Sequence, residues 1–475
     1  MIIHASQRVL GLAFAFGILG WGLFLAPISA PAAETSSTLM LESVPAEPFA
    51  DAADETDAEP VPTPSSATGS SATEKPMDLL SPPPVTERES PLVSLWDFVT
   101  QAFELSGPGD PNHPDRLRLT IATNVGYDDN VLTTKNDPIA SGTAGLNGTI
   151  SYNLGSERLK IASSLALGTT YYDNRPGDST DYNGTFGGQI SYYATRRLLL
   201  SGNFSISYLS QPNPTLIGGV SRFQGDYWAA NIGIDISYNI RPRLSARLGF
   251  SFSGIQYTDE VINQGSGFYQ QTYRIGLDYL VSPRVTLTTE YRYSPLSYYE
   301  ADQDSTGHIL TVGFITSITP KLKWTLQGGV EARQLQNETQ GGSSEYLGPF
   351  LETDLAYTFA PNSSLVGTLR YGTEPSGVAG ISVRETLRGS LGIAYAFTGR
   401  LTGSLSLSYQ HDNYDQPGDQ SDFAQQFTTA SVGLAFRINP AISVNANYTR
   451  SAVQSDFEAD EYTRGVTTLG LEIIF

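Results

Sequence analysis

Apolar and polar residues alternate one by one over most of the chain, from residue 116 to residue 475. At the start of this region, for example, Leu117, Leu119 and Ile121 are separated by single polar residues. Successive side chains of an extended strand point to opposite faces, so each such run has one apolar face and one small or polar face. The pattern therefore predicts a chain built mainly of β-strands.

Short turns and longer polar loops separate these runs in a regular order. Eight short turns, such as Gly155-Ser156-Glu157, have centres 37 to 46 residues apart. Longer polar loops lie between them, and the last three are predicted at 334–345, 411–424 and 450–461. A propeller repeats at a similar length, but its blades hold four short strands, whereas each repeat here holds two long ones. Long strands with short turns on one side and long loops on the other are typical of an outer-membrane β-barrel.

The turns and loops also predict how many strands the barrel has. Eight turns and nine loops give about 18 strands, within a range of 16–18. An open sheet edge would leave backbone groups unpaired in lipid, so the sheet must close on itself. We therefore predict an all-β, antiparallel, up-and-down transmembrane barrel over residues 116–475.

Aromatic residues gather near both ends of the predicted strands. On the loop side they include Tyr172, Tyr208 and Tyr257. Ordinary strand preference of tyrosine would not place rings at both ends, whereas the two interfaces of a membrane favour them. The chain then ends in an apolar alternation that resembles the C-terminal signal by which barrel-insertion machinery recognises outer-membrane barrels. The residues of this signal are Leu469, Leu471, Ile473 and Phe475.

The first 32 residues form a separate segment. Arg8 precedes a charge-free run from Val9 to Leu25, and the small-residue site Ala30-Pro31-Ala32 follows. This order is typical of a secretory signal peptide. An uncleaved membrane anchor is the alternative, but the run is shorter than the ~20 residues that span a bilayer.

Residues 33–115 have the composition of a disordered segment. They are rich in Pro, Ser and Thr and hold 16 acids against two bases. Such a segment cannot bury enough apolar surface to offset its chain entropy, which predicts a disordered periplasmic leader. Apolar residues at helical spacing in 92–105 predict one short amphipathic helix. This helix is either a tethered helix outside the barrel or a plug or partner-docking helix.

The charge of the chain is unevenly distributed. The net charge is −20, of which the leader contributes −14 and residues 116–475 only −7. An acidic chain is not expected to bind nucleic acid. The absence of Cys excludes disulfides, thiolate zinc sites and cysteine catalysis, and four His leave little for a metal centre.

Basic residues outnumber acids on the polar face of the strands. Charged side chains avoid lipid, so this face must point inward. One interpretation is a ladder of salt bridges that stiffens the wall. The other is a basic lining that favours anions. The ten basic residues predicted to line the lumen are Arg118, Lys160, Arg247, Arg274, Arg292, Lys323, Arg333, Arg370, Arg388 and Arg437, and Arg384 and Arg464 share their phase.

Enzyme and metal motifs are weak in this sequence. His411-Asp412 and His308 lie near the ends of predicted strands, but neither sits in a nucleophile motif. The acidic group Asp128-Asp129-Asn130 lacks the spacing of a calcium loop, and its side chains are suited to shaping the first loop through bonds to the backbone. We therefore predict no catalytic residues, no metal and no cofactor, and rank a rim hydrolase using His411 last.

Two segments resemble a known family. The motif Tyr127-Asp128-Asp129-Asn130, just past the first strand, is similar to the opening motif of β-barrel porins of the “porin 2” type. The hairpin around Tyr395–Leu401 also resembles hairpins of that family. The family includes outer-membrane barrels encoded with exopolysaccharide-production genes. The resemblance covers roughly residues 116–475 and implies fold and location more than substrate.

The expected function follows from the barrel and the resemblance together. We expect an outer-membrane channel for passive passage of solutes or export of polysaccharide, with the leader in the periplasm. Its partners would be outer-membrane lipid, the barrel-insertion machinery, and polysaccharide or small anionic solutes. The alternative is a structural or assembly barrel with a plugged pore that docks periplasmic partners. The sequence does not predict an oligomeric state.

Overall fold

The computed structural model describes one β-barrel. It covers residues 117–475 except 211–225, 259–266, 300–302, 338–341, 377, 379–380, 415–421 and 457–460. The predicted signal peptide, the leader and its helix at 92–105 lie outside the described residues. None of the described residues forms a helix long and apolar enough to cross a membrane.

The sheet of the described region has 18 strands. The first nine are β1 (Leu117–Asp128), β2 (Ser141–Gly155), β3 (Leu159–Tyr172), β4 (Thr180–Tyr193), β5 (Leu198–Leu209), β6 (Tyr227–Arg241), β7 (Leu244–Tyr257), β8 (Phe268–Ser282) and β9 (Val285–Tyr298). The last nine are β10 (Ser305–Thr319), β11 (Leu322–Asn337), β12 (Gly342–Ala360), β13 (Ser363–Pro375), β14 (Val383–Ala396), β15 (Leu401–Tyr414), β16 (Phe423–Asn439), β17 (Ile442–Ser455) and β18 (Tyr462–Ile474).

The barrel closes through its first and last strands. Each strand pairs antiparallel with its sequence neighbours, and β1 pairs with β18 from Thr120 opposite Ile474 to Asp128 opposite Val466. This ladder satisfies the backbone groups that an open edge would leave unpaired in lipid. The predicted closed barrel of about 18 strands is therefore confirmed.

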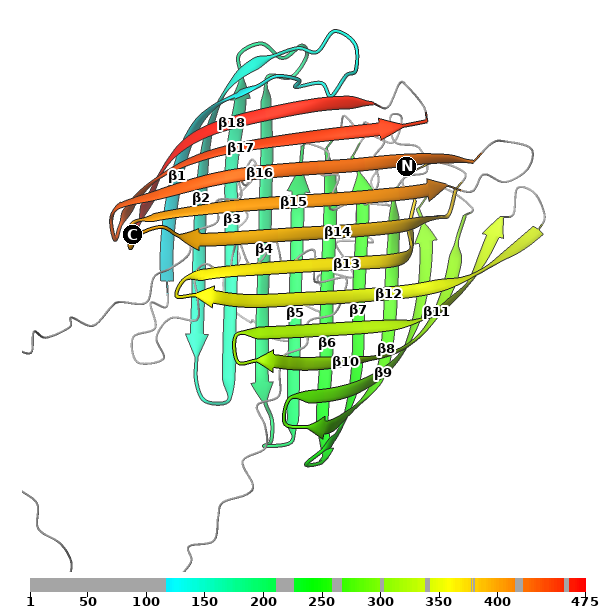
Figure 1. Ribbon diagram of the computed structural model, residues 1–475. Coiled ribbons are helices and arrows are strands. Elements are labelled where there is room, and N and C mark those ends of the chain that lie inside the picture. Colours follow the sequence, from blue (N-terminus) through cyan, green and yellow to red (C-terminus); the bar gives the residue numbers. More distant parts are fainter. Residues whose placement is uncertain are drawn as a thin grey trace, which may run out of the picture. The chain divides into compact units, whose positions relative to one another are not determined.

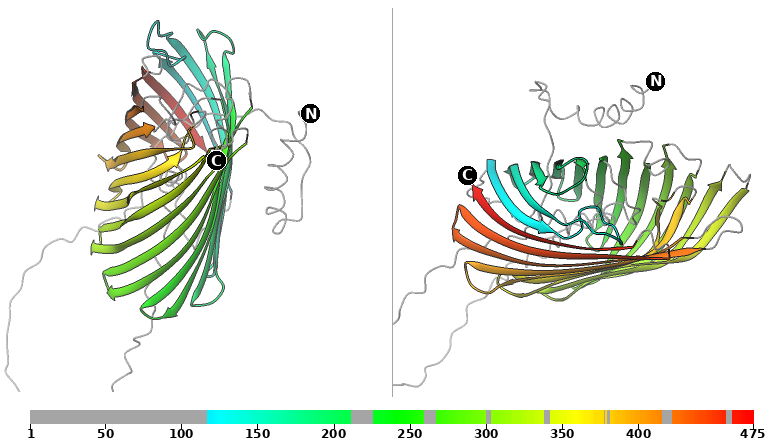
Figure 2. Two further views of the ribbon diagram at one scale, coloured as in Figure 1. Left: turned by 90° about the vertical axis from the view of Figure 1, so that its right-hand side faces the viewer. Right: turned by 90° about the horizontal axis from the view of Figure 1, so that it is seen from above.

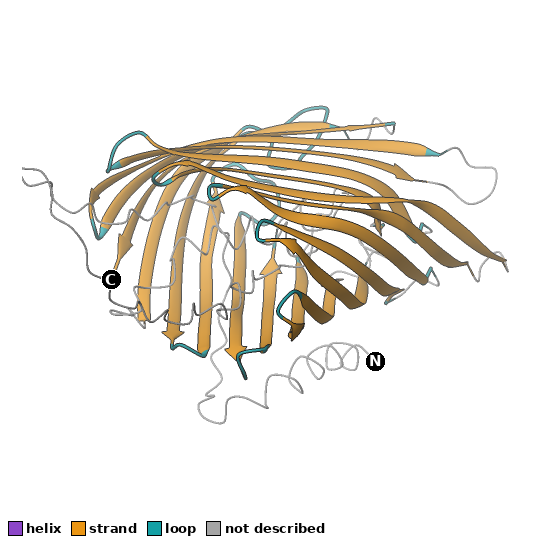
Figure 3. Ribbon diagram, turned by 60° about the horizontal axis from the view of Figure 1, so that its bottom comes forward, coloured by secondary structure: helices purple, strands orange, loops and turns teal. Residues whose placement is uncertain are grey.

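The two halves of the sheet form opposite walls. In Figure 1, strands β3–β8 run along the back wall, and β12–β18 cross in front of them at a steep angle. Figure 2 shows the two walls face to face when the barrel is seen from above. Short turns join the strands at one end and longer loops at the other, as the teal and grey segments of Figure 3 show.

Several strands extend further toward the loops than the sequence pattern suggests. β11 continues to Asn337, β15 to Tyr414 and β17 to Ser455, within segments predicted as loops. The apolar alternation ends earlier because these strand tips project beyond the lipid. Backbone pairing continues there, for example between Tyr414 and Phe423, because a hydrogen-bonded ladder does not require apolar side chains.

The predicted alternation of faces is visible in the burial of side chains. Large apolar residues such as Leu146, Ile275 and Leu310 are exposed on the outer face, where lipid would cover them. In the C-terminal signal, Leu469, Leu471 and Phe475 are also exposed, although their recognition by insertion machinery stays a prediction.

The predicted outer aromatic girdles are only partly correct. Tyr293 and Tyr409 lie exposed on the outer face near the loops. Tyr172 and Tyr257, however, are only 2% and 7% exposed. Both occupy the inward phase of their strands, so they pack inside the barrel instead of lying in lipid headgroups.

Candidate functional site: the barrel interior

Arginines and carboxylates pair along the inner face of the back wall. Arg247 on β7 lies 2.7 Å from Asp278 and 3.2 Å from Glu290 on the next two strands. Arg274 on β8 lies 2.9 Å from Asp235 on β6. These contacts link inward side chains across neighbouring strands.

The same network continues from β9 into the front wall. Arg292 lies between Glu290, at 2.7 Å, and Glu352 on β12, at 3.1 Å. Arg333 lies 3.0 Å from Glu331 on β11, and both side chains are almost fully buried. Such buried ion pairs persist only where each charge finds a partner.

A second group lies on β13, β14 and β15. Glu374 contacts Arg370 at 3.1 Å and Arg384 at 3.3 Å, and it also pairs with Arg388. Arg384 contacts the fully buried Asp412 at 2.9 Å. Three arginines thus share two carboxylates.

Charges of opposite sign balance across both groups. The paired arginines are Arg247, Arg274, Arg292, Arg333, Arg370, Arg384 and Arg388, and the seven acids are Asp235, Asp278, Glu290, Glu331, Glu352, Glu374 and Asp412. This balance supports the salt-bridge ladder more than a strongly basic lining. The sequence pattern suggested an excess of bases because it missed two acids. Glu374 lies where β13 bends, and Asp412 falls in a segment predicted as a loop.

The remaining predicted lining residues do not join these groups. They lie toward the short-turn end of the strands. Lys160 and Lys323 are exposed there, and Arg118 is near Glu472 of β18. Arg437 is close to the turn that follows β16. The structure thus brings together six of the ten predicted residues and leaves these four at the other end of the barrel.

The tip of the β13–β14 hairpin bends into the barrel. Pairing of β12 with β13 ends at Tyr371, whereas pairing of β13 with β14 continues to Pro375. The bend lies at Gly372, where a Cβ atom would come within 2.8 Å of the Phe350 ring. The close approach of this ring requires glycine.

Tyr298 on β9 holds this hairpin tip from the opposite side. Its hydroxyl oxygen lies 2.8 Å from the carbonyl oxygen of Ser376 and 2.6 Å from that of Ser382. It also accepts a hydrogen bond of 3.0 Å from the Ser376 N–H. Because β9 is four strands away from β13, this contact reaches across the interior.

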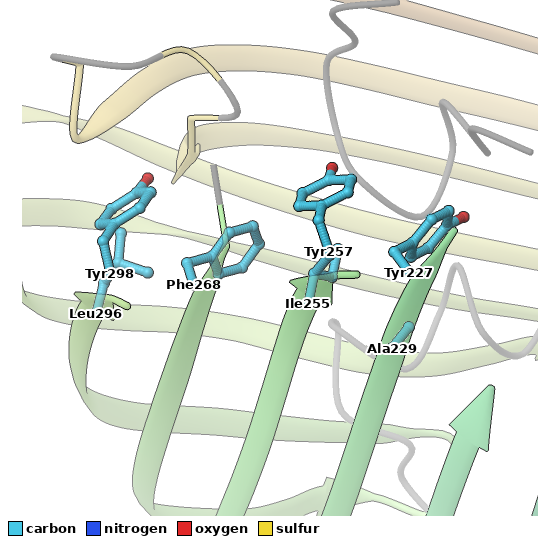
Figure 4. Packing of buried hydrophobic residues seen from close by; sticks show 7 residues of the cluster. All are labelled: Tyr227, Ala229, Ile255, Tyr257, Phe268, Leu296 and Tyr298. Atoms are coloured by element: carbon cyan, nitrogen blue, oxygen red, sulfur yellow. The ribbon is translucent and has the colours of Figure 1, made fainter. Parts of the chain in front are cut away.

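Apolar side chains pack on both sides of the hairpin tip. We call the first group the inner aromatic row, and Figure 4 shows it at the loop-side ends of β6–β9. Val383 packs against this row. On the other side, Val378 and Ile381 pack against Tyr414 and Phe423, whose rings stack at 4.4 Å. The inner aromatic row consists of Tyr227, Ala229, Ile255, Tyr257, Phe268, Leu296 and Tyr298. The described part of the interior is therefore narrowed at the loop-side end.

The family-like motif shapes the first loop. The backbone N–H of Asn130 donates to Asp128 at 3.0 Å. The Asn130 side chain accepts a bond from the Thr134 N–H at 3.0 Å and donates to the carbonyl oxygens of Thr134 and Thr463 at 2.7 and 2.9 Å. The expected bonds from these side chains to the backbone are confirmed. Tyr127 of the motif lies exposed on the outer face.

The same motif joins the first strand to the last two. Asp128 pairs with Arg464 of β18 at 2.5 Å. Asp129 accepts a hydrogen bond from the Gly465 N–H at 2.6 Å and pairs with Arg450 of β17 at 2.9 Å. The motif therefore fastens the seam at which the barrel closes.

The histidines considered for a rim hydrolase lack the required geometry. His411 and Asp412 occupy opposite faces of β15, and the Asp412 carboxylate binds Arg384, Thr386 and Gln410 inside the barrel. His308 stacks with tyrosines on the outer face. No His–Asp dyad is formed at either position. Among the described residues, no group of three or more His, Cys, Asp or Glu is arranged to hold a metal ion.

Similarity to solved structures is confined to other outer-membrane proteins among those compared. OccAB4 of Acinetobacter baumannii is 12% identical, with 77% of this chain and 100% of that chain covered and a TM-score of 0.40. A BenF-like porin of Pseudomonas fluorescens is 9% identical, with 76% and 99% covered and a TM-score of 0.42. OccK5 of Pseudomonas aeruginosa is 12% identical, with 76% and 99% covered and a TM-score of 0.41.

Similarity at the level of sequence comes from a family profile. None of the curated proteins matches the chain. The family described as “Putative beta-barrel porin 2” matches residues 295–475, from the end of β9 to the C-terminus. This region includes the hairpin around Tyr395–Leu401 but not the motif at Tyr127–Asn130. The resemblance of this outer-membrane barrel to the beta-barrel porin 2 family is therefore confirmed over residues 295–475.

Proposed function

We propose that this barrel is a porin-like channel through which small polar solutes cross the outer membrane passively. The observation that carries the proposal is a closed barrel with an apolar outer face and a charged inner face. A lining of balanced, buried charges suits polar solutes, because it offers both donors and acceptors along the wall. The match to the porin 2 family supports the same function.

The narrowed loop-side end favours small solutes over a polymer. Tyr298 and the hairpin tip are buried against each other there, so a polysaccharide chain would need this end to widen. The same burial also suits the second candidate, a structural barrel that does not conduct. These two functions differ in a single measurable property, the ion current through the purified barrel.

Single-channel recordings in planar bilayers test the proposal. We expect the full chain to conduct, and Tyr298→Phe to conduct more, because the variant loses the hydroxyl that binds Ser376 and Ser382. Tyr293→Phe is the matched control, since Tyr293 lies on the same strand but on the outer face. If neither the unmodified chain nor Tyr298→Phe conducts, the channel is refuted and the structural barrel is favoured.

A further inference from the structure

Three guanidinium groups surround one carboxylate on the inner face of β13 and β14. Glu374 contacts Arg370 at 3.1 Å and Arg384 at 3.3 Å, and it pairs with Arg388 as well. The side chains are 17%, 0% and 16% exposed for the three arginines and 8% for the glutamate. We call Arg370, Arg384 and Arg388 the arginine triad.

The triad is not fully neutralised by its neighbours. Besides Glu374, the carboxylate that contacts it is Asp412, which binds Arg384 at 2.9 Å. Three positive charges thus face two negative charges in this group, which leaves one positive charge in excess. Burying such an excess is costly unless a further anion can share the site.

The triad also holds hydrogen-bond donors that its described surroundings do not use. Nε of Arg388 donates to Gln410 at 3.1 Å, but the buried Nε atoms of Arg370 and Arg384 have no hydrogen-bond partner among the described residues. A buried donor without a partner is uncommon and unfavourable. These two atoms are therefore available to a group that enters the interior.

Resting on the proposed channel function, we propose that the arginine triad is a binding subsite for the carboxylate of an anionic solute. Glu374 occupies the subsite in the unliganded protein as an internal competitor. Guanidinium forks match the planar geometry of carboxylates and bind them with two hydrogen bonds. An entering carboxylate would use the free donors and remove the excess positive charge.

Phe350 makes the subsite suitable for an organic anion. Its ring is buried on β12, with the guanidinium carbon of Arg370 5.6 Å from the ring centroid. A carboxylated sugar or acid could therefore place carbon atoms near this ring while its carboxylate meets the triad. An inorganic anion such as sulfate would gain nothing from the ring.

Calorimetric titration of the full chain in detergent tests this subsite without relying on ion current. The probes are glucuronate and its neutral counterpart glucose. We expect Glu374→Gln to bind glucuronate at least about tenfold more tightly than the unmodified chain, because the internal competitor loses its charge. Glucose should bind neither form. The control Glu472→Gln removes an inward carboxylate near the short-turn end and should leave the dissociation constant unchanged.

Two further variants keep the test decisive. Glu374→Gln/Arg388→Gln removes one charge of each sign and should return to the affinity of the unmodified chain. If Glu374→Gln does not reach the folded form, which heat-modifiable migration on a gel reveals, Arg388→Gln alone should weaken glucuronate binding.

Several outcomes would overturn the subsite. They are equal affinity of Glu374→Gln and the unmodified chain for glucuronate, binding of glucose equal to that of glucuronate, or sulfate binding as tightly as glucuronate. A barrel that conducts without any gain in Glu374→Gln refutes the subsite alone. A barrel that binds glucuronate but carries no current refutes the channel alone.

Discussion

At the scale of single residues, Asp412 shows how much a buried charge depends on its partners. Its carboxylate accepts bonds from Arg384 at 2.9 Å, Thr386 at 2.8 Å and Gln410 at 2.7 Å. Asp412→Asn would leave the buried Arg384 short of one negative charge. Removal of one partner of a buried pair costs about 3–5 kcal/mol, so we expect the free energy of unfolding to fall by about 3 kcal/mol.

Denaturant unfolding of the barrel in detergent measures this loss. His411→Gln is the control, because His411 is the adjacent residue on the opposite face of the strand. Its effect should stay within about 0.5 kcal/mol, as for most substitutions outside a buried network. Equal losses for the two variants would show that the Arg384 pair is not the cause.

Glu461, in the last loop, gives the clearest pH dependence at this scale. Its hydrogen bond with Lys135, at 2.6 Å, holds the pKa of the Glu461 carboxyl below its ordinary value of 4.5. A lowered pKa means that the interaction stabilises the loop above about pH 4.5 and is lost as pH falls through the folded pKa.

The thermal midpoints of the unmodified chain and Glu461→Gln at several pH values test this sign. The unmodified chain should have a slightly higher midpoint at pH 7, and the difference should vanish below the pKa of Glu461. Because the pair is exposed, high salt should also reduce the difference. A difference that grows toward low pH would contradict the assignment.

At the scale of elements, the bend of β13 depends on Gly372. A Cβ atom at this position would lie 2.8 Å from the Phe350 ring and 3.1 Å from a carboxylate oxygen of Glu331. Both neighbours are buried and cannot move freely, so Gly372→Ala should displace the hairpin tip or strain it. We expect a loss of about 1–3 kcal/mol in the free energy of unfolding, measured in denaturant.

The control for this substitution is Gly155→Ala, at a short turn where a Cβ atom meets nothing within 4 Å. It should change the free energy of unfolding by less than about 0.5 kcal/mol. If Gly372→Ala is as mild as this control, the approach of Phe350 does not fix the bend.

The same elements show how far the sequence predicts this fold. Strand number, short turns and the two faces follow from alternation, because the period of two and the membrane together leave few other arrangements. The bend at Gly372 does not follow, since its cause is a contact with Phe350 on another strand. Glu374 and Asp412 were missed for related reasons, because one lies beside this bend and the other in a strand tip without apolar alternation. The partners of the predicted arginines therefore had to come from the structure.

At the scale of the whole molecule, the barrel depends on one seam that joins residues more than 300 positions apart in sequence. Two ion pairs of different burial reinforce it. Arg464 and Asp128 are 17% and 1% exposed, whereas Arg450 and Asp129 are 45% and 39% exposed. The comparison separates the effect of burial from that of position, because both pairs connect the same loop to the end of the chain.

Double-mutant cycles on the two pairs test which contact holds the seam. We expect a coupling energy of about 1–3 kcal/mol between Asp128 and Arg464, using Asp128→Asn and Arg464→Gln, because the buried carboxylate has little water to replace its partner. The Asp129→Asn and Arg450→Gln cycle should give less than about 1 kcal/mol, as exposed pairs do, and should fall further in high salt. Equal coupling for both pairs would mean that burial at the seam has no special effect. In that case the β1–β18 backbone ladder, not the motif, would be the main contact that closes the barrel.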